Sequence, residues 1–203
     1  MTTASLSPDY LKSKRESKTY TFVEYLRKEA KSVDKHEFIN GKIIKKSISN
    51  GPKNIINANV TSLIRNTENE SVLRKPLIFS SKQIIFLPKL KDCIYADITG
   101  LLDTPKYFDK DQILLINPVF IIEIISGSRA IADIKSRIDK YKTLESFKEY
   151  VFIRQDTCNV EVWYREKPGL WHETIVTEPD GILPLQSVGI SIEMREIYSG
   201  VEV

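Results

Sequence analysis

The chain has 203 residues, of which 41% are apolar, 28% are charged, 8 are Gly and 9 are Pro. This composition is typical of a soluble globular protein and excludes a collagen-like or largely disordered chain. No run of about 18 apolar residues occurs and the first residues are polar, so we predict no membrane span or secretion signal and expect the cytoplasm. With 2 Cys and 2 His, a disulfide framework or a Cys-based metal site is not expected. Carboxylate, lysine, arginine and hydroxyl groups remain for any chemistry.

Positive charge is concentrated in the N-terminal part of the chain. Residues 1–56 hold twelve Lys and Arg against six Asp and Glu, and the excess is sharpest around Lys42, Lys45, Lys46 and Lys53. We expect a polyanion such as nucleic acid to bind there. The alternative is a solvated face that only keeps the protein soluble.

The first third of the chain predicts an arm, a helix, a hairpin and a second helix. Residues 1–18 are aperiodic and are predicted as a mobile arm, followed by one domain over 19–203. A capping box at Thr21 and Glu24 starts a helix that runs to about residue 31. Asn40 and Gly41 separate strands at 36–39 and 42–48, and Pro52 opens a helix with an apolar stripe.

The remainder predicts a sheet, one helix and several short strands. Strands are expected at 77–87, 94–102 and 119–125, the last being central because it is apolar on both faces. A helix is predicted at 130–142, and short strands at 150–154, 160–165, 172–176 and 190–192. The fold class is therefore α/β or α+β, with a mixed β-sheet, flanking helices and additional β-hairpins.

Two carboxylates interrupt apolar strands. Glu123 lies within 119–125 and Asp97 within 94–102, and a buried unpaired carboxylate costs several kcal/mol. Two such acids on adjacent strands can share a divalent ion, and oxygen ligands suit Mg²⁺ or Mn²⁺. The alternatives are that either acid points outward or pairs with a helix lysine.

Helix 130–142 carries two cations that cannot both face this site. At about 100° per residue, Arg137 and Lys135 flank the apolar centre on opposite sides. Arg137 continues a ridge with Asp133 and Tyr141 at i, i+4 spacing, so the alternative for it is an exposed ion pair.

An ordered series of motifs resembles the Uma-type putative restriction endonuclease family of the PD-(D/E)XK nuclease superfamily. The series comprises Tyr20-Thr-Phe-x-Glu-Tyr-Leu, His36-Glu37-Phe-Ile-Asn-Gly, Tyr95-Ala-Asp97, the segment 117–126 and the segment 133–141. The resemblance implies a restriction-endonuclease-like mixed sheet, metal-dependent phosphodiester hydrolysis, and Asp97 and Glu123 as metal-binding acids. It also implies Glu37 as a third contributor, for which an ordinary hairpin surface residue is the alternative.

The chain departs from the family pattern at several positions. Ala96 replaces the proline before the first acid, Ile125 stands where a lysine follows the second acid, and Lys53 replaces a histidine. Arg137 matches the helix position where the family usually has its lysine. Arginine can stabilise developing charge but is a poor base.

The leading hypothesis is a Mg²⁺- or Mn²⁺-dependent endonuclease acting on DNA through Asp97, Glu123 and Arg137. The rival is a nuclease fold that has lost turnover and binds nucleic acid or a protein. Hydrolysis of another phosphate ester is a third reading. A homodimer is left open, and no membrane partner is expected.

Overall fold

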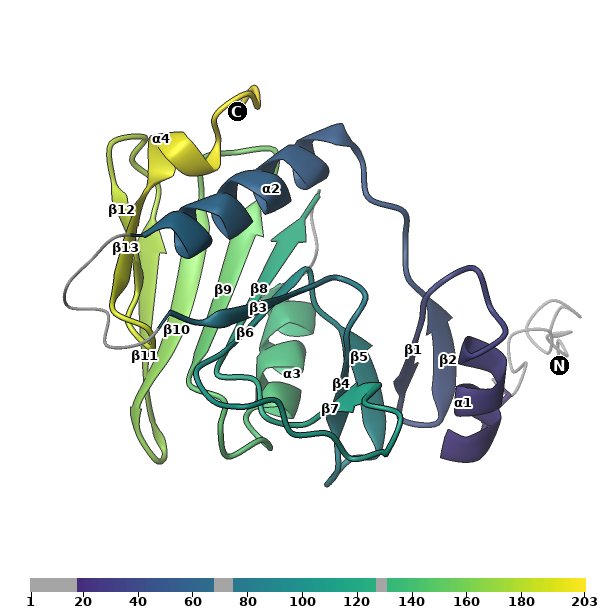
Figure 1. The fold of residues 1–203 in the computed structure, drawn as a ribbon. Coiled ribbons are helices and arrows are strands. Elements are labelled where there is room, and N and C mark those ends of the chain that lie inside the picture. The colour runs from purple at the N-terminus through teal and green to yellow at the C-terminus, as the bar shows by residue number, and fades with distance from the viewer. Residues whose placement is uncertain (1–17, 68–74, 127–130) are drawn as a thin grey trace, which may run out of the picture.

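The computed structural model describes residues 18–67, 75–126 and 131–203. Residues 1–17 of the expected arm lie outside these ranges. Within the described part there are four helices and three sheets (Figure 1). The helices are α1 (Phe22–Glu29), α2 (Gly51–Asn66), α3 (Ile131–Tyr141) and α4 (Met194–Ile197).

The larger sheet has six strands in the order β11-β10-β9-β8-β6-β3. Its members are β3 (Leu77–Ser80), β6 (Ile98–Leu101), β8 (Phe120–Ile125), β9 (Glu149–Arg154), β10 (Val160–Lys167) and β11 (Leu170–Val176). Strand β8 is buried along its whole length, parallel to β9 and antiparallel to β6. The prediction of a mixed sheet with this strand at its centre is confirmed.

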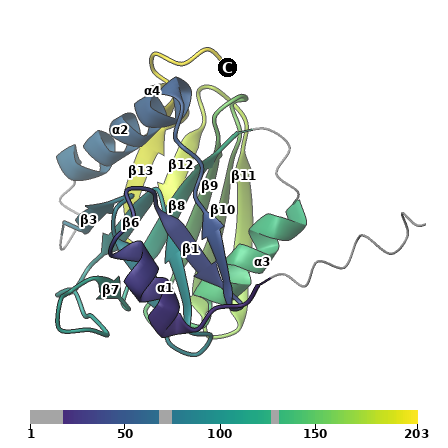
Figure 2. The same ribbon diagram turned by 90° about the vertical axis from the view of Figure 1, so that its right-hand side faces the viewer.

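The second sheet has five strands in the order β2-β1-β5-β4-β7. Its members are β1 (His36–Ile39), β2 (Lys42–Lys45), β4 (Ile84–Leu87), β5 (Asp92–Tyr95) and β7 (Leu114–Leu115). Asn40 and Gly41 form the predicted β1–β2 turn, with φ angles of 50° and 75°. Helix α1 covers the outer side of this sheet, where Tyr25 stacks on Phe38 (Figures 1 and 2).

The prediction of one long strand at 77–87 and another at 94–102 is wrong in one respect. Each breaks into two strands, and the two pieces belong to different sheets: β3 and β4 in one case, β5 and β6 in the other. Apolar periodicity does not show which sheet a residue joins, so the sequence pattern did not reveal where each predicted strand divides. The chain therefore crosses from one sheet to the other within each of these two segments, and Asp97 lies at the crossing between β5 and β6 rather than inside a strand.

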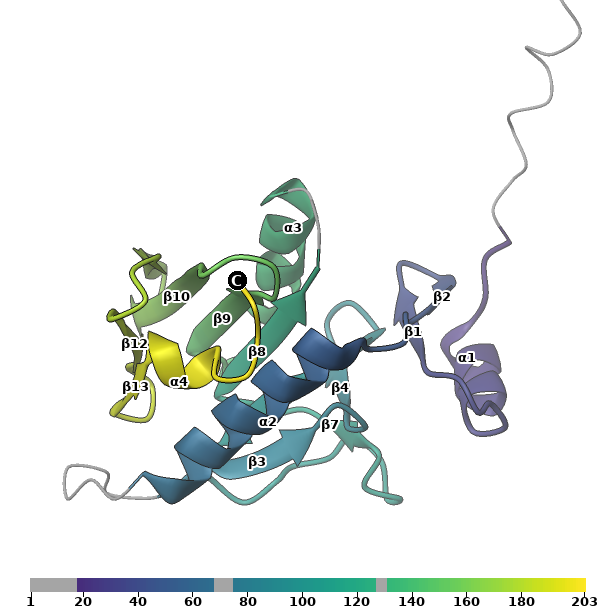
Figure 3. The ribbon, with the colours of Figure 1, turned by 90° about the horizontal axis from the view of Figure 1, so that it is seen from above.

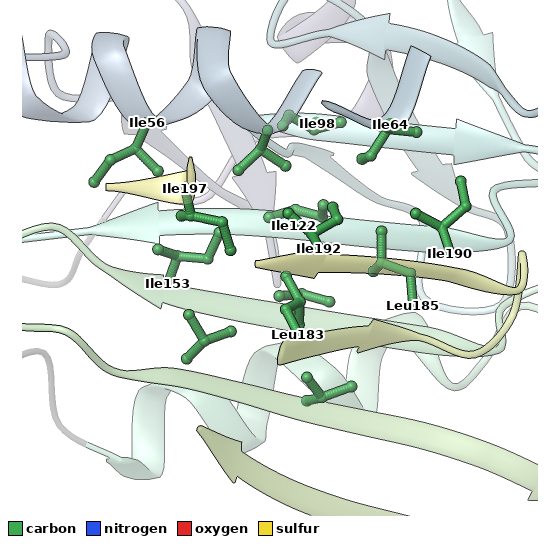
Figure 4. Packing of buried hydrophobic residues seen from close by; sticks show 14 of the residues in the cluster. Ile56, Ile64, Ile98, Ile122, Ile153, Leu183, Leu185, Ile190, Ile192 and Ile197 are labelled. Carbon is green, nitrogen blue, oxygen red and sulfur yellow. The ribbon is translucent and has the colours of Figure 1, made fainter. Parts of the chain in front are cut away.

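Helices α2 and α3 cover opposite faces of the six-stranded sheet (Figure 3). Because side chains alternate along a strand, Ile122 and Ile124 of β8 face α2, whereas Ile121 and Ile125 face α3. Figure 4 shows the α2 side of this core, where Ile56 packs among aliphatic side chains from several strands. The position of Glu123 between Ile122 and Ile124 therefore places it on the α3 face.

Three elements were not predicted: β7, β12 (Ile182–Leu185) and α4. Strand β12 pairs with β13 (Ile190–Glu193), and both close the α2 side of the core with α4 (Figure 1). Element ends also shift: α1 ends at Glu29, β2 at Lys45, and residue 130 lies outside the described ranges. Among the helices of the described part, none has the length and apolar character that crossing a bilayer requires.

Candidate active site

A cleft of about 260 Å³ lies where the two sheets and two helices meet. Four basic and three acidic side chains line it, and they come from distant parts of the sequence. These are Lys45, Lys46, Lys53 and Arg137, with Glu37, Asp97 and Glu123. The structure thus gathers every candidate site residue except Lys42 around one cleft.

Glu123 is held on the α3 side of the central strand. Its side chain is 3% exposed, and its Oε1 accepts hydrogen bonds from Arg137 Nε at 2.5 Å and from the Tyr141 hydroxyl at 3.1 Å. Burial and the neighbouring carboxylate raise the pKa of Tyr141 well above its usual value. The hydroxyl therefore remains a proton donor to Glu123 over the physiological pH range.

Arg137 joins acids from both sheets. Its terminal nitrogens donate to the two oxygens of Glu37 at 2.9 and 2.7 Å, and one of them also donates to the Tyr95 carbonyl at 3.1 Å. With Nε on Glu123, three sides of the guanidinium are engaged. The side chain is only 11% exposed, so the alternative of an exposed ion pair is wrong.

Glu37 is equally well held, and the alternative of a plain hairpin surface residue is wrong for it. Besides the two Arg137 bonds it accepts from the Tyr95 backbone N–H at 3.1 Å, and its side chain is 11% exposed. Burial opposes ionisation of Glu37, but Arg137, together with Lys46 and the Tyr95 N–H, outweighs it and lowers the pKa of this carboxyl. Burial likewise opposes the charge of Arg137, yet Glu123 and Glu37 raise the pKa of Arg137 above its usual value.

The other cation of the helix faces away from the cleft. Lys135 is exposed, and its Nζ lies 5.9 Å from the centre of the Trp163 ring. The helix periodicity had predicted that only one of the two cations faces the site, and the family resemblance had pointed to Arg137, which is the cation at the cleft.

Asp97 pairs with a helix lysine, which was one of the alternatives for a buried acid. Its Oδ2 lies 2.6 Å from Lys53 Nζ in the first turn of α2 and accepts the Ile124 backbone N–H at 2.8 Å. Its Oδ1 is 3.9 Å from Lys46 Nζ. The Asp97 side chain is 4% exposed, so the two lysines compensate its buried charge.

The four early lysines do not form one surface. Lys46 and Lys53 point into the cleft with 19% of each side chain exposed. Lys42 and Lys45 are exposed on β2, and Lys45 Nζ lies 2.6 Å from Asp34 at the rim. Burial lowers the pKa of Lys46 despite the nearby acids. Only two of the four are therefore placed to meet a ligand inside the cleft.

The carboxylate oxygens in the cleft are ligands of the type that Mg²⁺ binds. Within the described ranges, no group of three or more His, Cys, Asp and Glu side chains is arranged to hold a metal ion. Mg²⁺ is commonly held by one or two carboxylates together with substrate phosphates. Asp97 and Glu123 fit that requirement, although Lys53 and Arg137 compensate them here.

Sequence reasoning placed Tyr141 on the Arg137 ridge without giving it a role at the site, and it did not name Gln155. Tyr141 contacts Glu123, and its position four residues after Arg137 was the available signal. Gln155 follows β9 and lines the cleft, and its buried Oε1 has no hydrogen-bond partner among the residues that the structure describes. No sequence pattern marked Gln155, because its place depends on how β9 ends beside β8.

Comparisons with known proteins agree with this architecture. A family profile described as "Uma2: Putative restriction endonuclease" matches residues 22–195. An uncharacterised protein of Synechocystis sp. is 28% identical over 155 residues, which is 76% of this chain and 86% of that protein. The crystal structure of a putative nuclease belonging to DUF820 from Anabaena variabilis has a TM-score of 0.70 at 20% identity and covers 88% of this chain and 97% of its own. That likeness shows the shared fold. Because the profile spans most of the sequence, the chain belongs to the Uma2 family of putative restriction endonucleases.

Proposed function

We propose that this protein hydrolyses phosphodiester bonds of DNA in a Mg²⁺- or Mn²⁺-dependent reaction at the described cleft. The supporting observation is that three buried acids and three partly buried cations converge there from two sheets and two helices. Family membership supports a nuclease-like activity in general. The choice of a divalent ion rests on the carboxylates of the cleft, and the choice of DNA rests on the family description and on the lysines beside those carboxylates.

The proposed roles follow from the contacts. Asp97 and Glu123 would hold the ion, which would lower the pKa of a water molecule and polarise the phosphate. Arg137 orients Glu123 through its Nε and ties it to Glu37. Lys46 lies beside Asp97 with part of its side chain exposed to the cleft, so it would attract the phosphate backbone.

Plasmid cleavage tests the proposal. Supercoiled plasmid should be cut with Mg²⁺ or Mn²⁺ and not with EDTA, and Asp97→Ala should lower the rate by at least about 100-fold. Asp180→Ala is the matched control, because Asp180 is exposed and does not line the cleft. Circular dichroism must show that both variants are folded. Cleavage by folded Asp97→Ala at the wild-type rate would refute the assignment.

A second candidate is a nuclease fold that binds DNA without cutting it. The observation that favours it is that Arg137 already binds Glu37 and Glu123. In addition, arginine is a poor proton acceptor. This candidate predicts DNA binding that persists in EDTA.

One variant separates the candidates. Arg137→Lys restores the residue usual in the family, so a gain of cleavage would identify a weakened enzyme. No cleavage in either form, with binding intact, would identify a binding protein.

The affinity for DNA should weaken linearly with the logarithm of salt concentration, with a slope of about 0.9 per phosphate contact. Lys46→Ser should weaken this affinity more than Lys42→Ser. Equal effects of the two substitutions would show that the cleft is not where the phosphates bind.

A further inference from the structure

Lys53 occupies a position between two oxygen atoms of the cleft. Its Nζ lies 2.6 Å from Asp97 Oδ2 and also donates to the Ile124 carbonyl oxygen at 2.6 Å. Helix α2 fixes this position, because the Asn50 side chain caps the helix by accepting the backbone N–H of Lys53. The ammonium therefore links two parts of the cleft: Asp97, which lies between strands β5 and β6, and Ile124 of the central strand β8.

The two oxygens that hold Lys53 are also metal ligands by type. Carboxylate and backbone carbonyl oxygens bind hard divalent ions. An ion that bound both of these oxygens at about 2.1 Å would fill the space of the Lys53 nitrogen. Two cations on the same oxygens would also repel each other. Lys53 and a divalent ion at these two atoms therefore exclude one another.

A second lysine strengthens this competition. Lys46 Nζ lies 3.9 Å from Asp97 Oδ1 and donates to the Tyr95 carbonyl at 2.5 Å. Each oxygen of Asp97 thus faces its own ammonium group. The charge of this carboxylate is compensated before any ion arrives.

We propose that Lys53 is an internal cation that competes with divalent metal for Asp97 and the Ile124 carbonyl oxygen. Metal binds there only when the Lys53 side chain leaves, so the wild-type protein binds divalent ions weakly. This inference rests on the proposed function in one respect, since it concerns the metal position of that same site. Under this proposal, Lys53 determines how tightly the protein binds a divalent ion at this position.

Metal affinity provides the test, with Mn²⁺ as the probe and titration calorimetry as the readout. Lys53→Met should bind Mn²⁺ at least about tenfold more tightly than wild type, because the competing charge is removed. Lys42→Met is the matched control and should bind as wild type does, because Lys42 is exposed and does not line the cleft. Adding Asp97→Asn to Lys53→Met should return the affinity to the wild-type level. Equal or weaker Mn²⁺ binding by Lys53→Met would overturn the proposal.

A measurement on the wild-type protein keeps the proposal testable if Lys53→Met does not fold. The side-chain ammonium signal of Lys53 in nitrogen-15 NMR should change to that of a solvated lysine as Mg²⁺ saturates the site. Saturation of the Asp97 site with an unchanged Lys53 signal would overturn competition, while failure to saturate at millimolar Mg²⁺ would support it. Plasmid cleavage is scored separately: its absence would defeat the nuclease proposal and leave the Mn²⁺ comparison valid.

Discussion

Replacing Arg137 by methionine removes one guanidinium that serves two buried carboxylates. Its side chain is 11% exposed, and those of Glu37 and Glu123 are 11% and 3% exposed. Removing one partner of a buried ion pair costs about 3–5 kcal/mol, whereas an exposed pair contributes about 0–1 kcal/mol. We therefore expect the free energy of unfolding to fall by about 3–5 kcal/mol, a large share of the 5–15 kcal/mol typical of a domain. Methionine and arginine have similar helix propensities, so α3 itself should lose little.

Urea unfolding followed by circular dichroism measures this loss by linear extrapolation. Lys135→Met is the matched control, because Lys135 is an exposed cation on the same helix, and it should change stability by less than about 0.5 kcal/mol. In a Glu37→Gln background, Arg137→Met should cost less, since one of the two acids no longer needs a partner. A loss below about 1 kcal/mol for Arg137→Met alone would refute the argument that these pairs are desolvated.

Three further changes test other parts of the structure. The pKa of Glu37 lies below its ordinary value of 4.5, so the stability that its ionised form contributes is present above about pH 4.5 and is lost as pH falls through the folded-state pKa. The difference in unfolding free energy between wild type and Glu37→Gln should therefore shrink in acid, and a difference independent of pH would contradict this. Gly100→Ala should destabilise by about 1–3 kcal/mol in urea unfolding, because a Cβ there would lie 2.0 Å from a ring carbon of Phe120; wild-type stability would show that the ring moves freely. Asn50→Ala should cost about 1 kcal/mol in the same assay through loss of the α2 cap, and no loss would mean that solvent replaces the Asn50 oxygen.

Local patterns predicted the elements that depend on neighbouring residues. The capping box of α1 forms, and Asn40 and Gly41 adopt the positive φ angles that their turn requires. The helix periodicity separated Arg137 from Lys135 because 100° per residue is a property of the backbone alone. The unbroken apolar run around Glu123 indicated a strand buried on both faces, and β8 is such a strand.

The remaining features depend on contacts that the sequence does not order. The pairing of Lys53 with Asp97 and the Ile124 carbonyl requires α2, the passage between the sheets and β8 to meet. A buried acid also did not by itself indicate a site. Glu149 on β9 is fully buried outside the cleft, where the backbone N–H groups of residues 186 and 187 and the Ser187 hydroxyl donate to it. Burial raises the pKa of Glu149, and its role is to hold the turn between β12 and β13.

The distances along the chain between cleft partners have a consequence for folding. Arg137 and Glu37 are separated by 100 residues, and Lys53 and Ile124 by 71. Contacts of this kind carry a large loop-closure entropy and form after local helices and hairpins. The cleft should therefore be among the last parts of the molecule to assemble, and a partly folded chain with native helices would have no site. A mutation far from the cleft that populates such a chain would abolish ligand binding before helix content changes.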